Sequence, residues 1–343
     1  MSTKHFTANV ISATKVVPNG SFENSAASGV WTLDEQYDLR RGGNWPETGN
    51  VAPVAFWHLG TGNHIDSVSI TTLGDASDYG DLAVSLYHIG ACGNSTRVIF
   101  GGGSAGGTAN DTIQYISTKG GGTCSDFGDL TGAQNYASGL ANATRGIFGG
   151  GNRDGLSNDD TMSYITIGTT GNATDYGDLT QVGRKWRTCA SPTRGIFAMG
   201  YSTSGGVLNR IDHMTIGSTG NASDFGDLTG TNGQSNSSDT GAGCSSNVRG
   251  LINGPNEVMT YITIASTGNA TDFGDMTVSV RKGMAAASSN TRALNIAGYD
   301  GVSDFINVID YVEIATTGNA VDFGDTTARA WGAATGNAHG GLQ

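Results

Sequence analysis

Short apolar runs recur along this chain, separated by glycine, asparagine and aspartate. Within residues 179–227, a run of mostly small residues (182–190) precedes an apolar run that ends in glycine (193–200). Residues 211–216 then alternate apolar and polar side chains, as half-buried strands do, and 223–228 follow a Gly-Asn turn. This order predicts four short strands in about 49 residues, the size of one β-propeller blade.

The last of these strands carries a motif, Asp-(Phe/Tyr)-Gly-Asp, that occurs six times. The copies begin at Asp78, Asp126, Asp175, Asp224, Asp272 and Asp322, at intervals of 48, 49, 49, 48 and 50 residues. Such even spacing indicates one supersecondary unit repeated in tandem, because insertions into independent elements would have disturbed it. We therefore predict an all-β fold, a six-bladed β-propeller, in a single domain.

The two ends of the repeat predict how the propeller closes. Repetition begins at a second strand (54–60) and finishes at a first strand (327–335), so the chain ends would complete one blade together. Closure of this kind leaves no exposed sheet edge. Residues 339–343 align with the start of another second strand, which makes seven blades the less favoured alternative. The predicted parts are an attachment segment (1–50), the propeller (51–338) and a C-terminal tail (339–343).

The order of the strands resembles the kelch repeat. The second strand ends in a double glycine, as in 98–103 and 146–151, and the third strand carries a tyrosine, as in 162–167. The resemblance spans residues 51–338 and implies a kelch-like propeller. The fourth strand departs from the family, because Asp-Phe-Gly-Asp stands where kelch repeats usually carry a tryptophan.

The N-terminal segment predicts one short helix. Within residues 30–46, Thr32 is a candidate N-cap, Glu35 stands at the capping-box position and Gly42 would end the helix. Two interpretations stay open. The segment is either an anchor that inserts into a partner or a leader that packs on the side of the propeller.

The same segment carries a second resemblance. Trp-Thr-Leu-Asp-Glu-Gln-Tyr (31–37), followed by Trp-Pro and then by the Gly-Asn-Ala-Thr-Asp-Phe-Gly-Asp repeats, is similar to tail and virion structural proteins of marine bacteriophages. The resemblance implies a tail fibre or adhesin, present as a homo-oligomer or in many copies beside other virion proteins. The residues expected to dock it to the virion are Trp31, Leu33, Tyr37 and Trp45.

Composition agrees with a turn-rich β protein and excludes some partners. The 343 residues include 55 glycines but only 5 prolines, without a collagen period. The formal net charge of −12 comes mostly from aspartate, and no basic stripe offsets it, which argues against nucleic acid or anionic membrane as a partner. No signal peptide or long apolar run occurs, so we expect no membrane insertion. The phage resemblance implies synthesis in the host cytoplasm and a place in the virion.

Residue types that often carry chemistry fall mainly at repeated positions. Cys92, Cys189 and Cys244 each precede a repeated arginine by five residues, and with Cys124 they are expected to be buried free thiols. The repeated arginines should form ring-related points and no cluster: Arg97, Arg145, Arg194, Arg249 and Arg292. The histidines fall at unrelated positions, so none is assigned a role.

The paired aspartates of the motif favour a structural role. Two carboxylates around a glycine can face one cation, so calcium stays open as a cofactor, but a motif in every blade is unlike a unique chemical site. We expect the aspartates to accept backbone N–H bonds and tie each blade to its neighbour. The segment also faintly resembles the Asp-box turn of sialidases, which is structural there. No enzyme activity and no other cofactor is expected; a polysaccharide-degrading glycosidase is the alternative.

Variation among the repeats points to one face of the predicted disc. The turn between third and fourth strands is nearly invariant, whereas every loop between second and third strands differs, and residues 230–241 are inserted at a fourth-to-first connection. Such loops often carry recognition, although surface loops also drift without a function. The candidate ligand-binding residues are Asn152, Arg153, Asp154, Tyr201, Tyr299, Asp300 and Phe305.

The sequence thus predicts a non-enzymatic virion protein. It would dock through its N-terminal segment and bind a host-surface glycan or protein through its variable loops. A purely structural protein, such as a capsid decoration or a tail-knob spacer, is the alternative class.

Overall fold

The computed structural model describes residues 32, 52–60, 62–153, 158–198, 200–229 and 241–342. Contacts divide the chain into two units, Met1–Val51 and Ala52–Gln343. Apart from Thr32, every described residue belongs to the second unit. The helix expected within 30–46 therefore lies outside the described residues.

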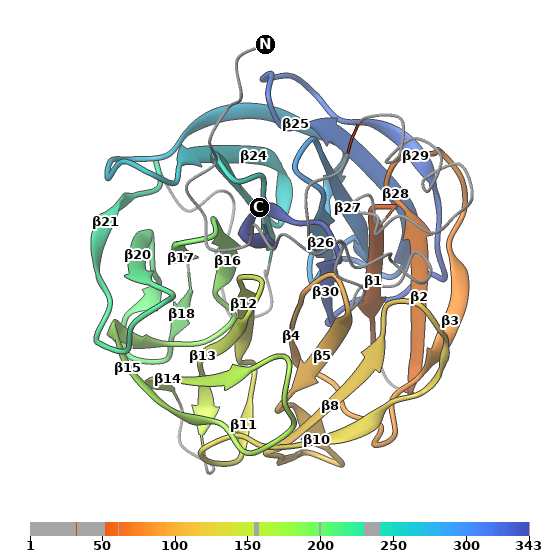
Figure 1. Ribbon diagram of the computed structural model, residues 1–343. Coiled ribbons are helices and arrows are strands. Elements are labelled where there is room, and N and C mark those ends of the chain that lie inside the picture. The colour runs from red at the N-terminus through yellow and green to blue at the C-terminus, as the bar shows by residue number, and fades with distance from the viewer. Residues whose placement is uncertain are drawn as a thin grey trace. The chain divides into compact units, whose positions relative to one another are not determined.

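Six antiparallel sheets form the blades of a β-propeller (Figure 1), which confirms the predicted fold class. The first strand of each blade is innermost, because these six strands contact one another around the axis. From the axis outward, the strands of blade I are β30 (Ala333–Gly336), β1 (Val54–His58), β2 (His64–Ser69) and β3 (Ser77–Asp81); of blade II, β4 (Gly90–Gly93), β5 (Arg97–Gly101), β8 (Thr112–Ser117) and β10 (Ser125–Asp129); of blade III, β12 (Ser138–Ala141), β13 (Arg145–Arg153), β14 (Asp159–Thr166) and β15 (Thr174–Gly183). Those of blade IV are β16 (Arg187–Ala190), β17 (Arg194–Ala198), β20 (Arg210–Thr215) and β21 (Ser223–Asp227); of blade V, β22 (Ala242–Ser245), β23 (Arg249–Asn253), β24 (Asn256–Thr263) and β25 (Thr271–Val280); of blade VI, β26 (Ala285–Ser288), β27 (Arg292–Tyr299), β28 (Phe305–Glu313) and β29 (Val321–Asp325).

Shorter elements lie in the connections between these strands. They are β6 (Ser104–Ala105), β7 (Thr108–Ala109), β9 (Gly122–Thr123), β11 (Gln134–Asn135), β18 (Tyr201–Ser202), β19 (Gly206–Val207) and the single-turn helix η1 (Gly340–Leu342).

Blade I closes the ring as predicted. The C-terminal strand β30 pairs antiparallel with the N-terminal strand β1, with Ala55 opposite Gly336 and His58 opposite Ala333. The strand is shorter than the expected 327–335. No seventh blade begins after it, because residues 340–342 form a turn of 3₁₀ helix and no strand.

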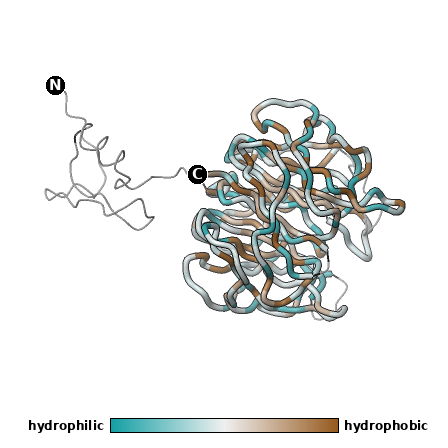
Figure 2. Tube along the Cα trace, turned by 90° about the vertical axis from the view of Figure 1, so that its right-hand side faces the viewer, coloured by the Kyte–Doolittle hydropathy of each residue, from teal (hydrophilic) through white to brown (hydrophobic). Residues whose placement is uncertain are grey.

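The hydrophobic core is divided into six clusters, each between two neighbouring blades. Ile99 of blade II and Phe148 of blade III, for example, are fully buried in one cluster. Hydrophobic residues accordingly follow the stacked strands of the disc (Figure 2). Next to the axis there is no room for such side chains: a Cβ on Gly243 would lie 2.7 Å from the Thr188 carbonyl oxygen of the adjacent blade. The small residues of the first strands are thus a packing requirement.

The Asp-(Phe/Tyr)-Gly-Asp motif ties neighbouring blades, as predicted, and its second aspartate accepts a backbone N–H through its main-chain carbonyl: Ala222 N–H donates to the Asp178 carbonyl at 2.8 Å. The second aspartate gives its backbone N–H to a side chain in the next blade's turn, as Asp178 donates to Asn221 Oδ1 at 3.1 Å. Asn172, Asn269 and Asn319 accept in the same way, and Asp75 does so in blade I. The short turn brings the asparagine side chain to the strand, so the main chain of the motif supplies both donor and acceptor, and these bonds do not use its carboxylates.

The repeated arginines also join blades and form no cluster, as predicted. Arg145 Nη1 donates to the Ile216 carbonyl of the next blade at 2.9 Å, and its guanidinium lies 4.3 Å from the ring centre of Tyr164. The same bond recurs from Arg97, Arg194, Arg249 and Arg292, the last of them across the closing seam to Ile70.

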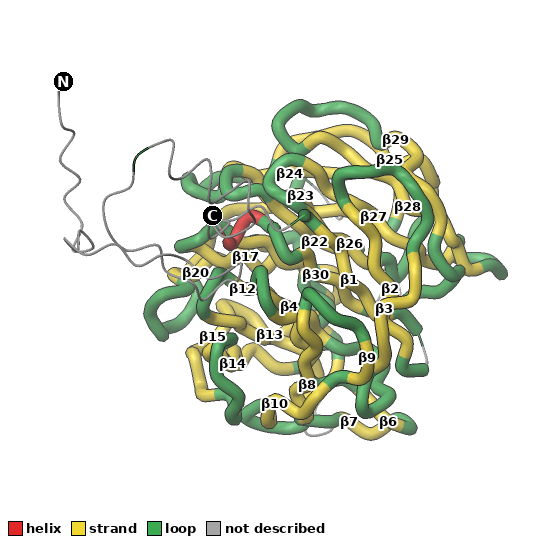
Figure 3. Tube along the Cα trace, turned by 45° about the vertical axis from the view of Figure 1, so that its right-hand side comes forward, coloured by secondary structure: helices red, strands yellow, loops and turns green. Residues whose placement is uncertain are grey.

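Residues after β30 run across one end of the central channel. Ala338 pairs with Ser289 of blade VI, the buried His339 ring bonds the Gly93 carbonyl of blade II at 2.9 Å, and η1 contacts β16 and β22. The expected C-terminal tail is therefore packed against the inner strands, with η1, drawn red in Figure 3, beside β22. This end of the channel lies on the face that carries the first-to-second and third-to-fourth turns, here named the turn face.

Candidate functional site

The opposite face, here named the mouth face, carries the second-to-third loops and the fourth-to-first connections. Where the first strands begin, a hollow of about 110 Å³ opens at the channel mouth. Its lining includes His88, Tyr136, Lys185, Gly283 and Trp331, each two residues ahead of a first strand. These five residues, here named the mouth ring, come from blades II, III, IV, VI and I. The variable connections predicted to share a face therefore do so, and they surround a pocket.

All five members of the mouth ring have a left-handed backbone. The φ angles are 57° at His88, 59° at Tyr136, 59° at Lys185 and 63° at Trp331, and Gly283 has 63°. Only one other described non-glycine residue, Ala297, has a positive φ. Bulky residues rarely adopt this conformation because Cβ crowds the backbone, and strained residues of this kind gather at functional sites.

The backbone around the mouth is fixed by hydrogen bonds between blades and within them. Tyr136 N–H donates to the His88 carbonyl at 2.9 Å, Lys185 N–H to the Tyr136 carbonyl at 3.1 Å, and Trp331 N–H to the Gly283 carbonyl at 2.7 Å. The second-to-third loops brace three of these connections through paired residues: Tyr87 with Ser104, Arg184 with Tyr201, and Lys282 with Tyr299. The variable loops thus hold the mouth ring in place.

On one side of the mouth, rings and cations stack in order around the axis. The rings of His88 and Tyr136 are 4.1 Å apart, and Lys185 Nζ lies 4.5 Å from the Tyr136 ring centre. The guanidinium of Arg184 lies 5.2 Å from Tyr136 and 5.5 Å from Tyr201. Cation–π contacts of this length fix the cations against aromatic faces.

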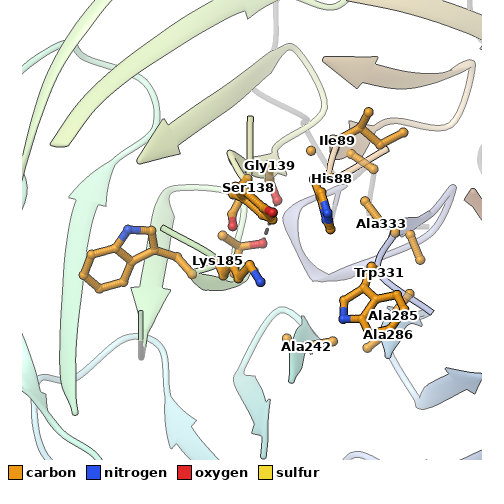
Figure 4. A pocket seen from close by; sticks show the side chains of 18 of the residues that line it. His88, Ile89, Ser138, Gly139, Lys185, Ala242, Ala285, Ala286, Trp331 and Ala333 are labelled. Atoms are coloured by element: carbon orange, nitrogen blue, oxygen red, sulfur yellow. Dashed lines mark hydrogen bonds between the residues drawn. The ribbon is translucent and has the colours of Figure 1, made fainter. Parts of the chain in front are cut away.

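On the other side, Trp331 belongs to a three-ring cluster. Its ring centre lies 5.6 Å from Tyr299 and 5.7 Å from Phe305, and those two rings are 5.7 Å apart. Gly283 makes room for the indole, because a Cβ there would lie 2.6 Å from Trp331 Cδ1. Figure 4 shows His88, Lys185 and Trp331 projecting toward the hollow from different sides.

The histidine of the mouth ring is neutral at ordinary pH. Burial, with Lys185 and Arg184 nearby, lowers the pKa of His88 to about 3. Burial also raises the pKa of Tyr136. Both side chains therefore offer uncharged hydrogen-bonding groups, and the described residues lining the hollow include the Lys185 ammonium but no aspartate or glutamate.

The structure brings three of the predicted ligand-binding residues close to the mouth. Tyr299 and Phe305 pack on Trp331, with Phe305 49% exposed, and Tyr201 braces Arg184. Asp300 instead caps its own loop, accepting the N–H groups of three residues from Val302 to Asp304.

The predicted loop of blade III has a supporting role. Asn152 extends β13 to pair with Asn135, immediately before Tyr136 of the mouth ring. Arg153 donates to the Thr131 carbonyl at 2.7 Å and pairs with Asp159 at 3.6 Å. Neither residue lines the hollow. Asp154 and the docking candidates Trp31, Leu33, Tyr37 and Trp45 lie outside the described residues.

Sequence reasoning missed four members of the mouth ring: His88, Tyr136, Lys185 and Trp331. These residues lie in the connection ahead of each first strand. The sequence pattern had placed this connection within the strand of small residues itself. The sequence did contain a signal for these residues. When the repeats are aligned, four unlike, bulky residues fall at one position among neighbouring small residues.

Deeper in the channel the lining is small and polar, with buried thiols. Cys92, Cys189 and Cys244 border it from three first strands, and burial raises the pKa of each. All four cysteines are free and buried, as predicted. Across the described ranges, no group of three or more His, Cys, Asp or Glu side chains is placed to hold a metal ion.

No protein family and no curated protein matches the sequence of this chain. Among the residues that the structure describes, no helix is long and apolar enough to cross a membrane. The propeller itself hosts many unrelated functions, so arguments about function depend on the mouth face.

Proposed function

We propose that this protein acts by binding, with the mouth face as its recognition surface. One observation carries the proposal: four bulky, mutually unlike side chains are held in a strained left-handed backbone around a hollow. A turn that served only the fold would be relaxed by glycine, as at Gly283. Contact with a ligand would explain why the other four positions keep large side chains: His88, Tyr136, Lys185 and Trp331.

The proposed setting is a bacteriophage virion, with a host-surface glycan or protein as the ligand. The sequence resemblance to marine phage tail and virion proteins supports the setting. Many weak contacts would be multiplied by copy number, which raises avidity without new contacts at any one site. The N-terminal residues Trp31, Leu33, Tyr37 and Trp45 would dock the protein to its virion partners.

Cell binding by the full-length protein tests the recognition role. The labelled protein is incubated with host cells, beside a variant with Lys185→Gly and Trp331→Gly. Binding by the parent and at least a tenfold loss in the variant are expected. A Lys119→Gln variant, altered on the turn face, is the control and should bind as the parent does. A parent that does not bind host cells, or a variant that binds equally well, would contradict the proposal.

Virion assembly tests the docking role separately. Phage particles carrying Trp31→Ala and Trp45→Ala together are purified and their protein content is measured. Loss of this chain from the particles is expected, while the soluble variant still binds cells. Normal incorporation would refute the docking role of these tryptophans.

A further inference from the structure

The hollow at the channel mouth combines two features that no single loop provides. An aromatic side chain, Trp331, faces it from blade I, and a cation, Lys185, faces it from blade IV (Figure 4). Uncharged polar groups of His88 and Tyr136 lie between them along the ring. A ligand that fits the indole, the cation and the polar groups between them must present a flat, weakly polar face, several hydroxyl-like groups and a negative charge.

We propose that the mouth ring binds an acidic saccharide, with the sugar ring against Trp331 and its carboxylate directed to Lys185. This inference rests on the proposed binding function and names the ligand class. Pyranose rings present a face of C–H groups, which carry partial positive charge and suit the negative face of an indole. A carboxylate accepts charge-assisted bonds from an ammonium, which are shorter and stronger than neutral ones.

The Trp331 indole and the Lys185 side chain are both held in position by neighbouring residues, as expected of a preformed binding site. The indole of Trp331 is held by Tyr299 and Phe305 and by the absence of a side chain at Gly283. Lys185 is held over the Tyr136 ring, with its backbone N–H on the Tyr136 carbonyl. Groups fixed before binding lose little conformational entropy when a ligand arrives.

The charge of the surroundings also favours an anion at this point. The chain as a whole has a formal net charge of −12. Lys185 nevertheless lines the hollow, the Arg184 guanidinium lies 5.2 Å from the Tyr136 ring centre, and no described carboxylate is part of the lining. His88 stays neutral and can donate one hydrogen bond and accept another. A saccharide offers hydroxyl groups for both.

The size of the hollow limits what enters it. A volume of about 110 Å³ accepts a ring or a terminal group rather than a whole oligosaccharide. We therefore expect the end or one protruding residue of a longer glycan to enter, while neighbouring sugars lie over Tyr299, Phe305 and Tyr201.

The test uses the full-length protein and a panel of oligosaccharides that carry uronic or sialic acids. Each acidic probe is paired with its carboxyl-reduced counterpart, which keeps the ring and loses the charge. The parent protein should bind at least one acidic probe, with affinity at least tenfold lower for the reduced partner. If no acidic probe binds, or the reduced probe binds equally well, the inference is overturned.

Two substitutions separate the roles of the ring and the charge. Trp331→Gly should abolish binding of acidic and reduced probes, whereas Lys185→Gln should lower affinity about tenfold for the acidic probe and leave the reduced probe unchanged. Lys119→Gln removes the same charge from the turn face and should change neither. Because glycine suits the backbone at 331, thermal unfolding should show an intact fold. Equal losses for both probes in Lys185→Gln would refute the assigned charge contact.

The outcomes also separate this inference from the broader proposal. Host-cell binding that depends on the mouth ring, without binding of any acidic saccharide, would overturn the ligand class and leave the recognition role intact. Absence of host-cell binding would overturn the recognition role itself.

Discussion

The two faces of the propeller are built from the same repeat, but one carries recurring hydrogen bonds between blades and the other carries residues that vary from blade to blade. On the turn face, two bonds recur in five of the six blades. An asparagine or aspartate accepts from the preceding blade's motif in every blade but II, and an arginine reaches the next blade's carbonyl from every blade but I. On the mouth face, the equivalent position holds a different residue in a left-handed backbone in each of the five blades where the structure describes it. Repeated bonds of this kind serve the packing of blade on blade, whereas variation at one fixed position agrees with the proposal that these side chains contact a ligand.

The largest expected effect comes from the turn face, at the glycine of the motif. A Cβ at Gly226 would lie 2.5 Å from the Gly268 carbonyl oxygen, and φ is 150°. Gly226→Ala should therefore lower the free energy of unfolding by about 3 kcal/mol, since backbone must move. Chemical denaturation measures the change. Gly217→Ala, where nothing lies within 4 Å, is the control; equal effects in both variants would break the distinction drawn for this face.

The next largest effect compares two arginines at opposite ends of β13. Arg145, on the turn face, bonds the next blade's Ile216 carbonyl, while Arg153, on the mouth face, serves its own loop. Arg145→Met should lower stability by about 2 kcal/mol, because a carbonyl loses its charged donor and the Tyr164 contact is lost. Arg153→Met should lower it by under about 1 kcal/mol. A larger loss for Arg153 in denaturant unfolding would reverse the comparison.

At the mouth ring the sign should reverse. Lys185 has φ 59°, so Lys185→Gly relieves backbone strain and should raise the free energy of unfolding by about 1 kcal/mol while weakening ligand binding. The matched control is Lys119→Gly on the turn face, at a residue without a positive φ, which should lower stability by about 0.5–1 kcal/mol. Destabilisation by Lys185→Gly would show that the fold itself needs this side chain.

The smallest effect is a pH dependence confined to the mouth face. The pKa of His88 is lowered to about 3 in the folded protein, whereas the unfolded chain binds the proton near pH 6.5. Stability is therefore retained above that pH and falls as the pH drops, by about 0.7 kcal/mol between pH 7 and pH 6 from this residue alone. The difference in unfolding free energy between the parent and His88→Gly, followed over this range, measures it. A difference that does not change with pH would contradict the buried, neutral histidine.

The sequence alone predicted six blades, with seven as the less favoured alternative, and determined the closing seam and the division into a uniform and a variable face. A period of about 49 residues with four strand signals leaves few architectures, and the strand order at the two ends requires β30 to complete blade I. The repeated position of Arg145 and its equivalents also predicts ring-related points and no cluster. Local sequence patterns suffice to predict these features because the strands of each blade pack against the neighbouring blade in the same way.

Only the tertiary structure decided which residues meet at the axis. Trp331 and Lys185 are 146 positions apart in the sequence, and neither differs locally from an ordinary turn residue. The ring brings them to one hollow, gives them the same left-handed backbone and seats the indole over Gly283. The C-terminal residues were likewise ambiguous until the inner strands showed a channel end for them to cover. Sequence periodicity reveals the strand and turn residues that the blades have in common. The site consists of residues that differ from blade to blade, and only the closure of the ring brings these together around the axis.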